Sequence, residues 1–136
     1  MFFGRKSDRK YKIALIDDEK ELVDAVTKFL EARHFEVCSA YGGRTGLEII
    51  RSESPDLIVL DIMMPDMDGR DILKELKKNP LTKNIPVILL SAKNEAFDEE
   101  LGRELGADDY LTKPCKMKDL INTINSNLNR IQGERS

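Results

Sequence analysis

Residues 57–69 of the chain read LIVLDIMMPDMDG, and the pattern of this stretch is the strongest indication of the fold. It opens with four consecutive apolar residues, Leu57-Ile58-Val59-Leu60, and Asp61 follows directly. A strand with water on one face alternates apolar and polar residues, whereas a strand buried on both faces is apolar throughout. The stretch therefore predicts an inner strand of a parallel sheet covered by helices, with a carboxylate at the carboxyl end of that strand.

Five short apolar runs of this kind recur along the chain, and each is followed by a segment with helical spacing. The predicted strands are residues 12–16, 35–40, 57–60, 86–90 and 109–112. The helical segments each carry an apolar stripe: Leu22, Val23, Val26, Phe29 and Leu30; Leu47 and Ile50; Ile72, Leu73 and Leu76; Leu120, Ile121, Ile124, Leu128 and Ile131. Five consecutive βα units with right-handed crossovers predict an open, three-layer α/β fold.

Two helix ends are readable from breaker residues. Asn79-Pro80 should end the third helix, and Gly106 should serve as a left-handed cap after the fourth helix, residues 95–105. That fourth helix has a thin apolar stripe of Phe97, Leu101 and Leu105. Because little apolar surface is buried there, we expect it to open locally at low free-energy cost. Uniform hydrogen-exchange protection across all five helices would contradict this expectation.

Composition limits the classes of function. The chain has 136 residues, 22 Lys and Arg against 25 Asp and Glu, and a formal net charge of −3. There is no strong basic field to hold nucleic acid, and the apolar runs are too short for membrane insertion. No apolar signal segment follows Met1, so we expect a cytoplasmic protein. We expect one domain over residues 11–131, with a polar tail at 1–10 and another at 132–136.

The histidine and cysteine content excludes several kinds of site. His34 is the only histidine, and it has no partner for a metal site or a Ser-His or Cys-His pair. It lies near a predicted helix end, where a surface position is the ordinary outcome. Cys38 and Cys115 are too few for a disulfide framework or a zinc site. Triad hydrolases and most zinc enzymes are therefore excluded.

Polar residues gather at the predicted strand ends, where ligand sites of open α/β sheets lie. Strand one ends in Asp17-Asp18, strand three in Asp61, strand four in Ser91, and strand five runs through Tyr110 to Lys113-Pro114. Three close carboxylates need a proton or a cation, and oxygen-only ligands favour a hard ion such as Mg²⁺. With a lysine and a hydroxyl beside them, these groups point to phosphoryl transfer onto an aspartate.

At these residues the chain resembles the receiver domain of two-component response regulators. Four pieces carry the resemblance, in order along the chain: Leu15-Ile16-Asp17-Asp18-Glu19, the stretch from Leu60 to Gly69, Leu90-Ser91-Ala92-Lys93, and the stretch from Gly106 to Pro114. Together with the five βα units it covers about residues 11–131. It implies a doubly wound, flavodoxin-like sheet of five parallel strands in the order 2-1-3-4-5.

The resemblance also implies the role of each site residue. Asp61 would be the phosphoryl acceptor; Asp17, Asp18 and Asp61 would hold Mg²⁺ (or Mn²⁺) together with the backbone carbonyl of Met63. Lys113 would contact the phosphoryl group and Ser91 would hydrogen-bond to it. Tyr110 would be a switch that turns inward as Ser91 moves, and the Lys113–Pro114 peptide bond would be cis.

The implied function is a signalling switch in which a sensor histidine kinase passes a phosphoryl group from its phosphohistidine to Asp61. The active state would present the face of the fourth helix, fifth strand and fifth helix to an unknown output protein. The chain would be a phosphoacceptor rather than an enzyme, acting only on its own aspartyl phosphate. We expect a single-domain regulator, monomeric when unphosphorylated. The alternatives are a receiver fragment of a larger, DNA-binding regulator and an intermediate phosphorelay carrier.

Two positions near the site bear on the lifetime of the phosphorylated form, and some site residues also have ordinary structural interpretations. Met63 cannot orient an attacking water and Lys93 can lean over the phosphoryl group, so we expect a persistent phosphorylated form. Taken singly, Asp17-Asp18 could be a helix cap and Lys113 a surface lysine; their joint placement favours a site.

Other functions with the same fold or similar motifs fit less well. A calcium loop around Gly69 fails because Met64 would occupy its first position. A phosphatase would need an acid where Met63 lies, and two acids after strand one would repel the phosphate of a flavin. A scaffold that is never phosphorylated would not need an intact acidic site.

Overall fold

The computed structural model describes residues 10–92 and 99–135, and these form one α/β layer structure. Strands and helices alternate along the chain: β1 (Lys12–Ile16), α2 (Lys20–Ala32), β2 (Glu36–Ala40), α3 (Gly43–Glu53), β3 (Leu57–Asp61), α4 (Gly69–Lys78), β4 (Val87–Ala92), α5 (Glu99–Glu104), β5 (Asp109–Lys113) and α6 (Met117–Arg135). All four strand pairings are parallel, and the strand order is β2-β1-β3-β4-β5. The predicted fold class and strand order are confirmed.

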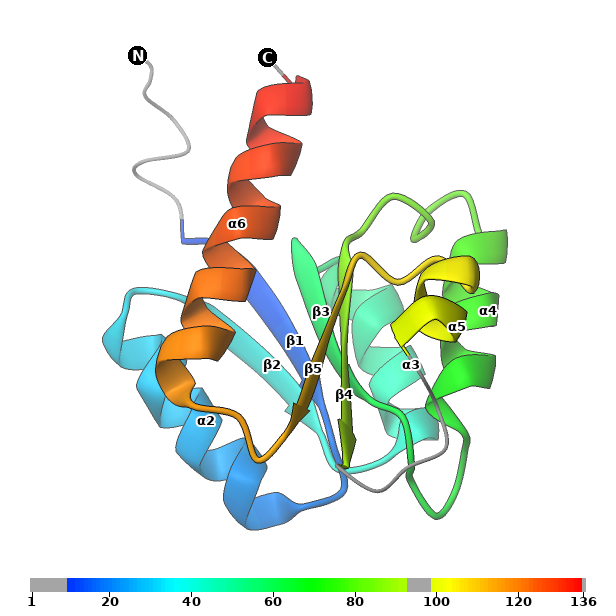
Figure 1. The fold of residues 1–136 in the computed structure, drawn as a ribbon, viewed down its shortest axis with the longest axis horizontal. Coiled ribbons are helices and arrows are strands. Elements are labelled where there is room, and N and C mark those ends of the chain that lie inside the picture. The colour runs from blue at the N-terminus through cyan, green and yellow to red at the C-terminus, as the bar shows by residue number, and fades with distance from the viewer. Residues whose placement is uncertain (1–9, 93–98, 136) are drawn as a thin grey trace.

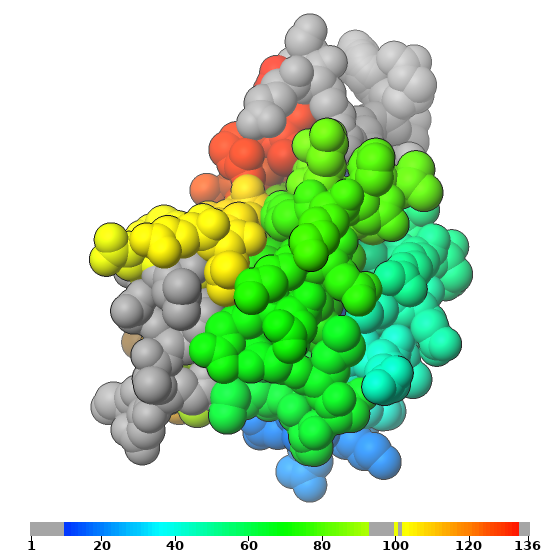
Figure 2. Space-filling model, turned by 90° about the vertical axis from the view of Figure 1, so that its right-hand side faces the viewer, coloured from blue at the N-terminus to red at the C-terminus, as the bar shows by residue number. Residues whose placement is uncertain are grey.

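Helices cover both faces of this sheet (Figure 1). Helices α2 and α6 lie on one face, and α3, α4 and α5 lie on the other, where α4 is central and α5 stands at its edge (Figure 2). The three inner strands are buried over their whole apolar length, which explains why they carry no alternation. Among the described residues, none of the helices is long and apolar enough to cross a bilayer.

Each face of the sheet has its own apolar core. On the α2 and α6 face, Val23, Val26 and Leu30 of α2 pack with Leu120, Ile124, Leu128 and Ile131 of α6. On the opposite face, Leu47 and Ile50 of α3 pack with Ile72, Leu73 and Leu76 of α4. These residues belong to the predicted apolar stripes; Leu22, Phe29 and Ile121 are half-buried at their margins.

Element boundaries differ from the predicted ones in three places. Helix α6 continues to Arg135, so residues 132–135 extend the helix and do not form a separate loose tail. Strand β2 begins at Glu36, because Phe35 packs into the core after the turn at His34, which has a positive φ of 73°. Helix α5 ends at Glu104. Residues 93–98, which include Phe97 and the first residues of the predicted fourth helix, lie outside the described residues.

The breaker residues act as expected. Helix α4 ends at Lys78 with Asn79 as its extended C-cap residue, directly before Pro80. Gly106 has a φ of 104°, the left-handed conformation that favours glycine, at the turn between α5 and β5. The two cysteines are free, and they lie on or beside opposite edge strands of the sheet.

Candidate functional site

Three aspartates from two strands meet at the carboxyl edge of the sheet. Asp17 and Asp18 follow the last residue of β1, and Asp61 is the last residue of its neighbour β3. Each offers a carboxylate oxygen within 4.8 Å of the others. Asp17 and Asp61 are buried, while Asp18 is half-buried. The parallel register of two adjacent strands therefore creates a compact anionic cluster that water only partly screens.

Lys113, the last residue of β5, brings an ammonium group to this cluster. Its Nζ lies 2.8 Å from Oδ2 of Asp17 and 3.5 Å from Oδ1 of Asp61. It also donates a hydrogen bond of 2.7 Å to Oε1 of Glu19. The Lys113–Pro114 peptide bond is cis. Among the described residues, one cation thus faces four carboxylates, counting Asp18, and these residues together carry a negative excess.

The electrostatics of the cluster shift the proton affinity of two groups. Burial, and then the charge of Asp17, raise the pKa of Asp61 to about 7, although Lys113 and the N–H of Met63 oppose the rise. Burial disfavours the Lys113 ammonium, but its close contacts with the carboxylates of Asp17 and Glu19 outweigh this and raise the pKa of Lys113. Around neutral pH, a second cation near Asp61 would therefore stabilise its ionised form.

The residues present fit a hard divalent cation. Oδ2 of Asp17 is fully buried and accepts no well-directed hydrogen bond from the described residues, although Nζ of Lys113 is near it. Carboxylate oxygens without histidine or thiolate match the ligand preference of Mg²⁺ or Mn²⁺. Asp17, Asp18 and Asp61 are thus the residues that could hold such an ion.

Ser91 and Tyr110 lie beside the cluster on two paired strands. Ser91 in β4 is fully buried, and its Oγ lies 2.5 Å from the hydroxyl oxygen of Tyr110 in β5. The Tyr110 ring is half-buried against the core beneath α4. The two side chains are therefore in direct contact, so a movement of one breaks this contact unless the other follows.

The turn after β3 is held tightly beneath the site. The N–H of Gly69 donates a 2.7 Å hydrogen bond to the carbonyl of Ile62, and a Cβ at Gly69 would lie 2.5 Å from the backbone oxygen of Asp61. Asp68 caps α4 by accepting from the N–H of Arg70. Met63 extends from this turn with 57% of its surface exposed. Lys93, the other residue expected to face the phosphoryl group, lies outside the described residues.

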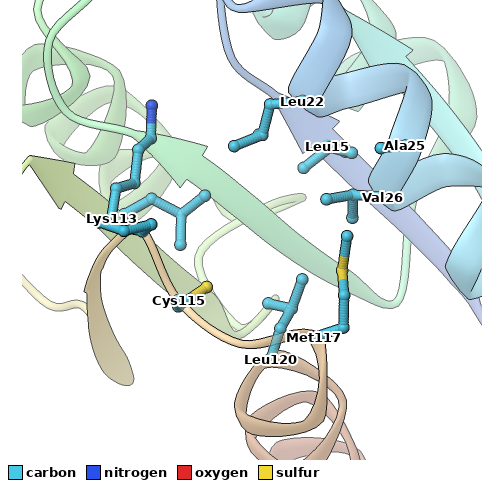
Figure 3. A pocket seen from close by; sticks show the side chains of 10 residues that line it. Leu15, Leu22, Ala25, Val26, Lys113, Cys115, Met117 and Leu120 are labelled. Carbon is cyan, nitrogen blue, oxygen red and sulfur yellow. The ribbon is translucent and has the colours of Figure 1, made fainter.

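An apolar pocket of about 180 Å³ borders the site on the α2 side (Figure 3). The side chain of Lys113 forms part of its wall, next to Cys115 at the start of the loop to α6. Leu22 and Val26 of α2 face it from the other side. The packing between α2 and the start of α6 is thus incomplete next to the side chain of Lys113.

Glu19 is a residue of the site that the sequence does not single out, because there it is only the last residue of the acidic motif after strand one. Its carboxylate reaches Lys113 across 94 positions of the chain. The sequence signal for this contact is the position of Glu19 directly after Asp18. Residues 19 and 113 then lie at the same edge of the sheet, since each is close to the carboxyl end of a parallel strand. The sequence also did not indicate that Tyr110 would contact Ser91 in this arrangement.

Comparison with known proteins gives a consistent result. The family model of the response regulator receiver domain matches residues 13–125. A CheY-like response regulator receiver domain protein from Methanospirillum hungatei has a TM-score of 0.86 at 28% identity, over 93% of this chain and 99% of that one. A receiver domain protein from Clostridium thermocellum has a TM-score of 0.82 at 35% identity, over 90% and 97% of the two chains.

A third similar structure comes from a different kind of protein. The signal receiver domain of a signal transduction histidine kinase from Syntrophus aciditrophicus has a TM-score of 0.81 at 31% identity. The match covers 89% of this chain and 92% of that one.

Proposed function

The chain belongs to the response regulator receiver domain family, and on that premise we propose that it accepts a phosphoryl group on Asp61 in a reaction that requires Mg²⁺. Receiver domains act in phosphorylation-dependent signalling. The observation that carries the proposal is the convergence of Asp17, Asp18, Asp61 and Lys113 at one edge of the sheet. Burying several carboxylates that one ammonium neutralises only in part costs folding free energy. A domain that accepts no phosphoryl group would have no use for such a cluster.

The proposed step is a group transfer from a phosphohistidine of a sensor histidine kinase. A carboxylate oxygen of Asp61 forms a bond to phosphorus while the bond from phosphorus to the imidazole nitrogen breaks, and the electron pair stays on that nitrogen. Mg²⁺, when bound by the three aspartates and the backbone carbonyl of Met63, supplies positive charge to the phosphoryl oxygens. Lys113 orients the transferring group and neutralises part of its charge, and Ser91 offers a hydroxyl to it.

The readout follows from the contact between Ser91 and Tyr110. A phosphoryl group that recruits the Ser91 hydroxyl withdraws it from the Tyr110 hydroxyl, and this favours a different position of the ring. Tyr110 lies in β5, between α5 and α6, so we propose the face of α5, β5 and α6 as the output surface. The domain over residues 11–131 is the phosphoacceptor unit in this proposal, and its output protein is unassigned.

The phosphorylated form should persist. Met63 carries no group that could orient a water molecule for attack on the acyl phosphate, and its side chain points largely into solvent. We also place the reaction in the cytoplasm, because the phosphohistidine of a sensor kinase derives from ATP. A receiver of this kind catalyses only its own phosphorylation and dephosphorylation.

Acetyl phosphate with Mg²⁺ tests the proposal directly, with intact mass as the readout. We expect a single phosphoryl addition, its loss when EDTA replaces Mg²⁺, and its loss in Asp61→Asn. Asp71→Asn is the matched control, since Asp71 is an exposed aspartate in the first turn of α4. Equal phosphorylation of wild type and Asp61→Asn would refute Asp61 as the acceptor.

A further inference from the structure

Glu19 is the N-cap residue of α2, but its side chain does not cap the helix. Its backbone is fixed at both sides: its N–H donates to Oδ1 of Asp17 at 2.9 Å, and its carbonyl accepts from the N–H of Val23 at 3.0 Å. The carboxylate instead accepts the 2.7 Å hydrogen bond from Lys113. A side-chain cap at the N-terminus stabilises a helix. The Glu19 carboxylate does not make this local contact and contacts Lys113, which is distant in sequence, instead.

Glu19 differs from the other two partners of the Lys113 ammonium. Asp17 and Asp61 are buried and belong to the carboxylate cluster, whereas 58% of the Glu19 side chain is exposed. Glu19 can therefore leave Lys113 by a rotation into solvent, without opening the core. Its contact with the ammonium is shorter than that of Asp61, 2.7 Å against 3.5 Å.

We propose that Glu19 is a positioning residue that holds the Lys113 ammonium in the unphosphorylated protein and competes with the phosphoryl group for it. The inference rests on the proposed function, in which Lys113 contacts the phosphoryl group. An ammonium has three N–H donors, and one of them is directed to Glu19. Phosphorylation must redirect this donor and must also place a dianionic group near the charge of Glu19.

The first test compares phosphorylation rates of Glu19→Gln and Glu21→Gln with acetyl phosphate at saturating Mg²⁺. Glu21 is exposed in the same first turn, so its variant makes the same change in net charge. We expect Glu19→Gln to react about 3–10-fold faster than wild type, as expected for removal of a unit charge several ångströms away at a largely wet site. Glu21→Gln should stay within about twofold of wild type, since exposed distant charges are screened.

The outcomes separate this inference from the proposed function. A wild type that takes no phosphoryl group would refute the proposed function, and with it any competition at Lys113. A wild type that is phosphorylated while Glu19→Gln and Glu21→Gln react at the same rate would overturn only the role of Glu19.

A double-mutant cycle gives a readout that does not depend on phosphorylation. The melting temperatures of wild type, Glu19→Gln, Lys113→Met and the double variant are measured in EDTA. We expect Glu19→Gln to lower the melting temperature by about 1–4 °C when Lys113 is present, the range for a partly exposed ion pair. It should cause no decrease when residue 113 is methionine. Additive effects of the two substitutions would overturn the contact itself.

Discussion

At the scale of single residues, Asp61 stands out because it is buried beside another carboxylate and has a pKa of about 7. In the unfolded chain an aspartate titrates near its ordinary value of about 3.9. Between these two values the folded protein binds a proton that the unfolded chain does not bind. The free energy of unfolding therefore decreases as pH rises from about 4 to about 7, and the cost of the buried charge is fully present above that range.

This cost predicts that Asp61→Asn stabilises the protein in the absence of divalent cations. The increase in the free energy of unfolding should be near zero at about pH 4 and on the order of a few kcal/mol at about pH 8. Thermal unfolding followed by circular dichroism in EDTA checks both values. Added Mg²⁺ should then raise the melting temperature of wild type more than that of the variant. An equal melting temperature of the two proteins at pH 8 would contradict the prediction.

At the scale of secondary-structure elements, α3 depends on a cap from another part of the chain. Its N-cap residue is Gly42, which has no side chain to offer. Asp66, in the turn after β3, accepts from the N–H of Gly43 at 2.9 Å and of Arg44 at 3.2 Å. These two backbone hydrogen bonds lower the pKa of Asp66. The turn that carries Asp61 at its start is thereby joined to the start of α3.

Asp66→Ala should consequently destabilise the protein by about 1 kcal/mol, the typical cost of losing an N-cap. Because the pKa of Asp66 is lowered on folding, its contribution is present above about pH 4 and is lost as pH falls through the folded pKa. Urea unfolding of Asp66→Ala beside Glu48→Ala, on the exposed face of α3, measures the difference. If both variants had the same urea midpoint as wild type, Asp66 would not act as the N-terminal cap of α3.

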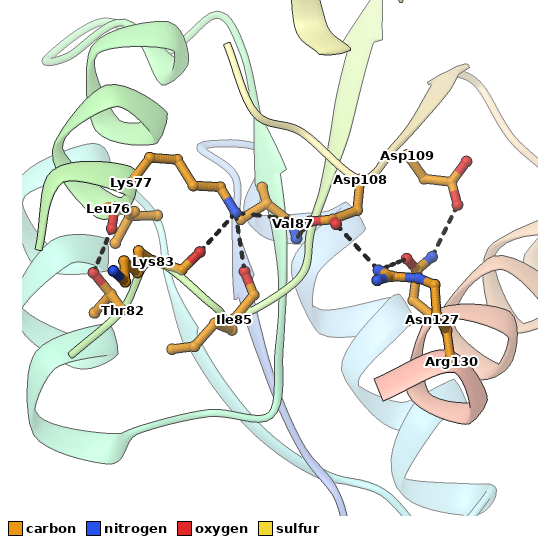
Figure 4. A network of polar contacts seen from close by, with 10 residues as sticks. All are labelled: Leu76, Lys77, Thr82, Lys83, Ile85, Val87, Asp108, Asp109, Asn127 and Arg130. Carbon is orange, nitrogen blue, oxygen red and sulfur yellow. Dashed lines mark hydrogen bonds and ion pairs between the residues drawn. The ribbon is translucent and has the colours of Figure 1, made fainter. Parts of the chain in front are cut away.

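A second link between elements lies at the opposite edge of the sheet (Figure 4). Asp108 accepts from the N–H of Val87 at 2.8 Å and from Arg130 at 3.1 Å, and its carboxylate is 3.8 Å from Nζ of Lys77. Burial lowers the pKa of Lys77, and the charge of Asp108 partly offsets this. One carboxylate thus connects α4, β4, β5 and α6.

Asp108→Ala should destabilise the protein by about 2–3 kcal/mol, since it leaves the N–H of Val87 without its acceptor and removes the negative charge near the half-buried ammonium of Lys77. That ammonium keeps its hydrogen bonds to the carbonyls of Lys83 and Ile85. Glu104→Ala, an exposed change at the end of α5, is the control. Denaturant midpoints of the two variants provide the comparison. If Asp108→Ala lowered the denaturant midpoint no more than Glu104→Ala does, water would replace these contacts at no cost in stability.

These elements also show what a sequence can predict. The inner strands are apolar throughout because both faces are buried, so their positions and the convergence of Asp17, Asp18 and Asp61 were predictable from local pattern. Two other contacts could not be predicted in this way, namely those of Glu19 with Lys113 and of Asp66 with Gly43. They depend on how side chains bridge segments that are distant in sequence. Helix α6 extends past its last apolar residue, Ile131, where hydrophobic spacing gives no signal.

At the scale of the whole molecule, the two apolar cores lie on opposite faces of one sheet and share its strands. The carboxyl edge carries the acidic cluster, and the opposite edge carries the polar links around Asp108. Strand β5 takes part in both, since Asp109 begins it and Lys113 ends it. A shift of β5 relative to β4 would therefore disturb both edges at once, which suits an output face built on this strand.

The charges at the start of β5 bear on the state of association. Asp108 is paired with Arg130, and Asp109 accepts a hydrogen bond of 2.9 Å from Asn127 of α6. Both carboxylates are thus occupied within one subunit. Residues Thr123 and Asn125 of α6 carry no charge that could pair with an acidic residue of a second copy.

We therefore predict that the unphosphorylated protein is a monomer. Sedimentation velocity from about 10 to about 500 μM should give a single species near 15.5 kDa in EDTA, because pairing within the subunit leaves little charge complementarity for a second copy. The variant Arg130→Ala, which frees one side of Asp108, tests whether that pairing matters. We expect it to remain monomeric too, because Asp108 still accepts from the N–H of Val87 and stays close to the ammonium of Lys77. A mass that rises toward twice this value with concentration in wild type would contradict the prediction and would indicate an interface that does not depend on these charges.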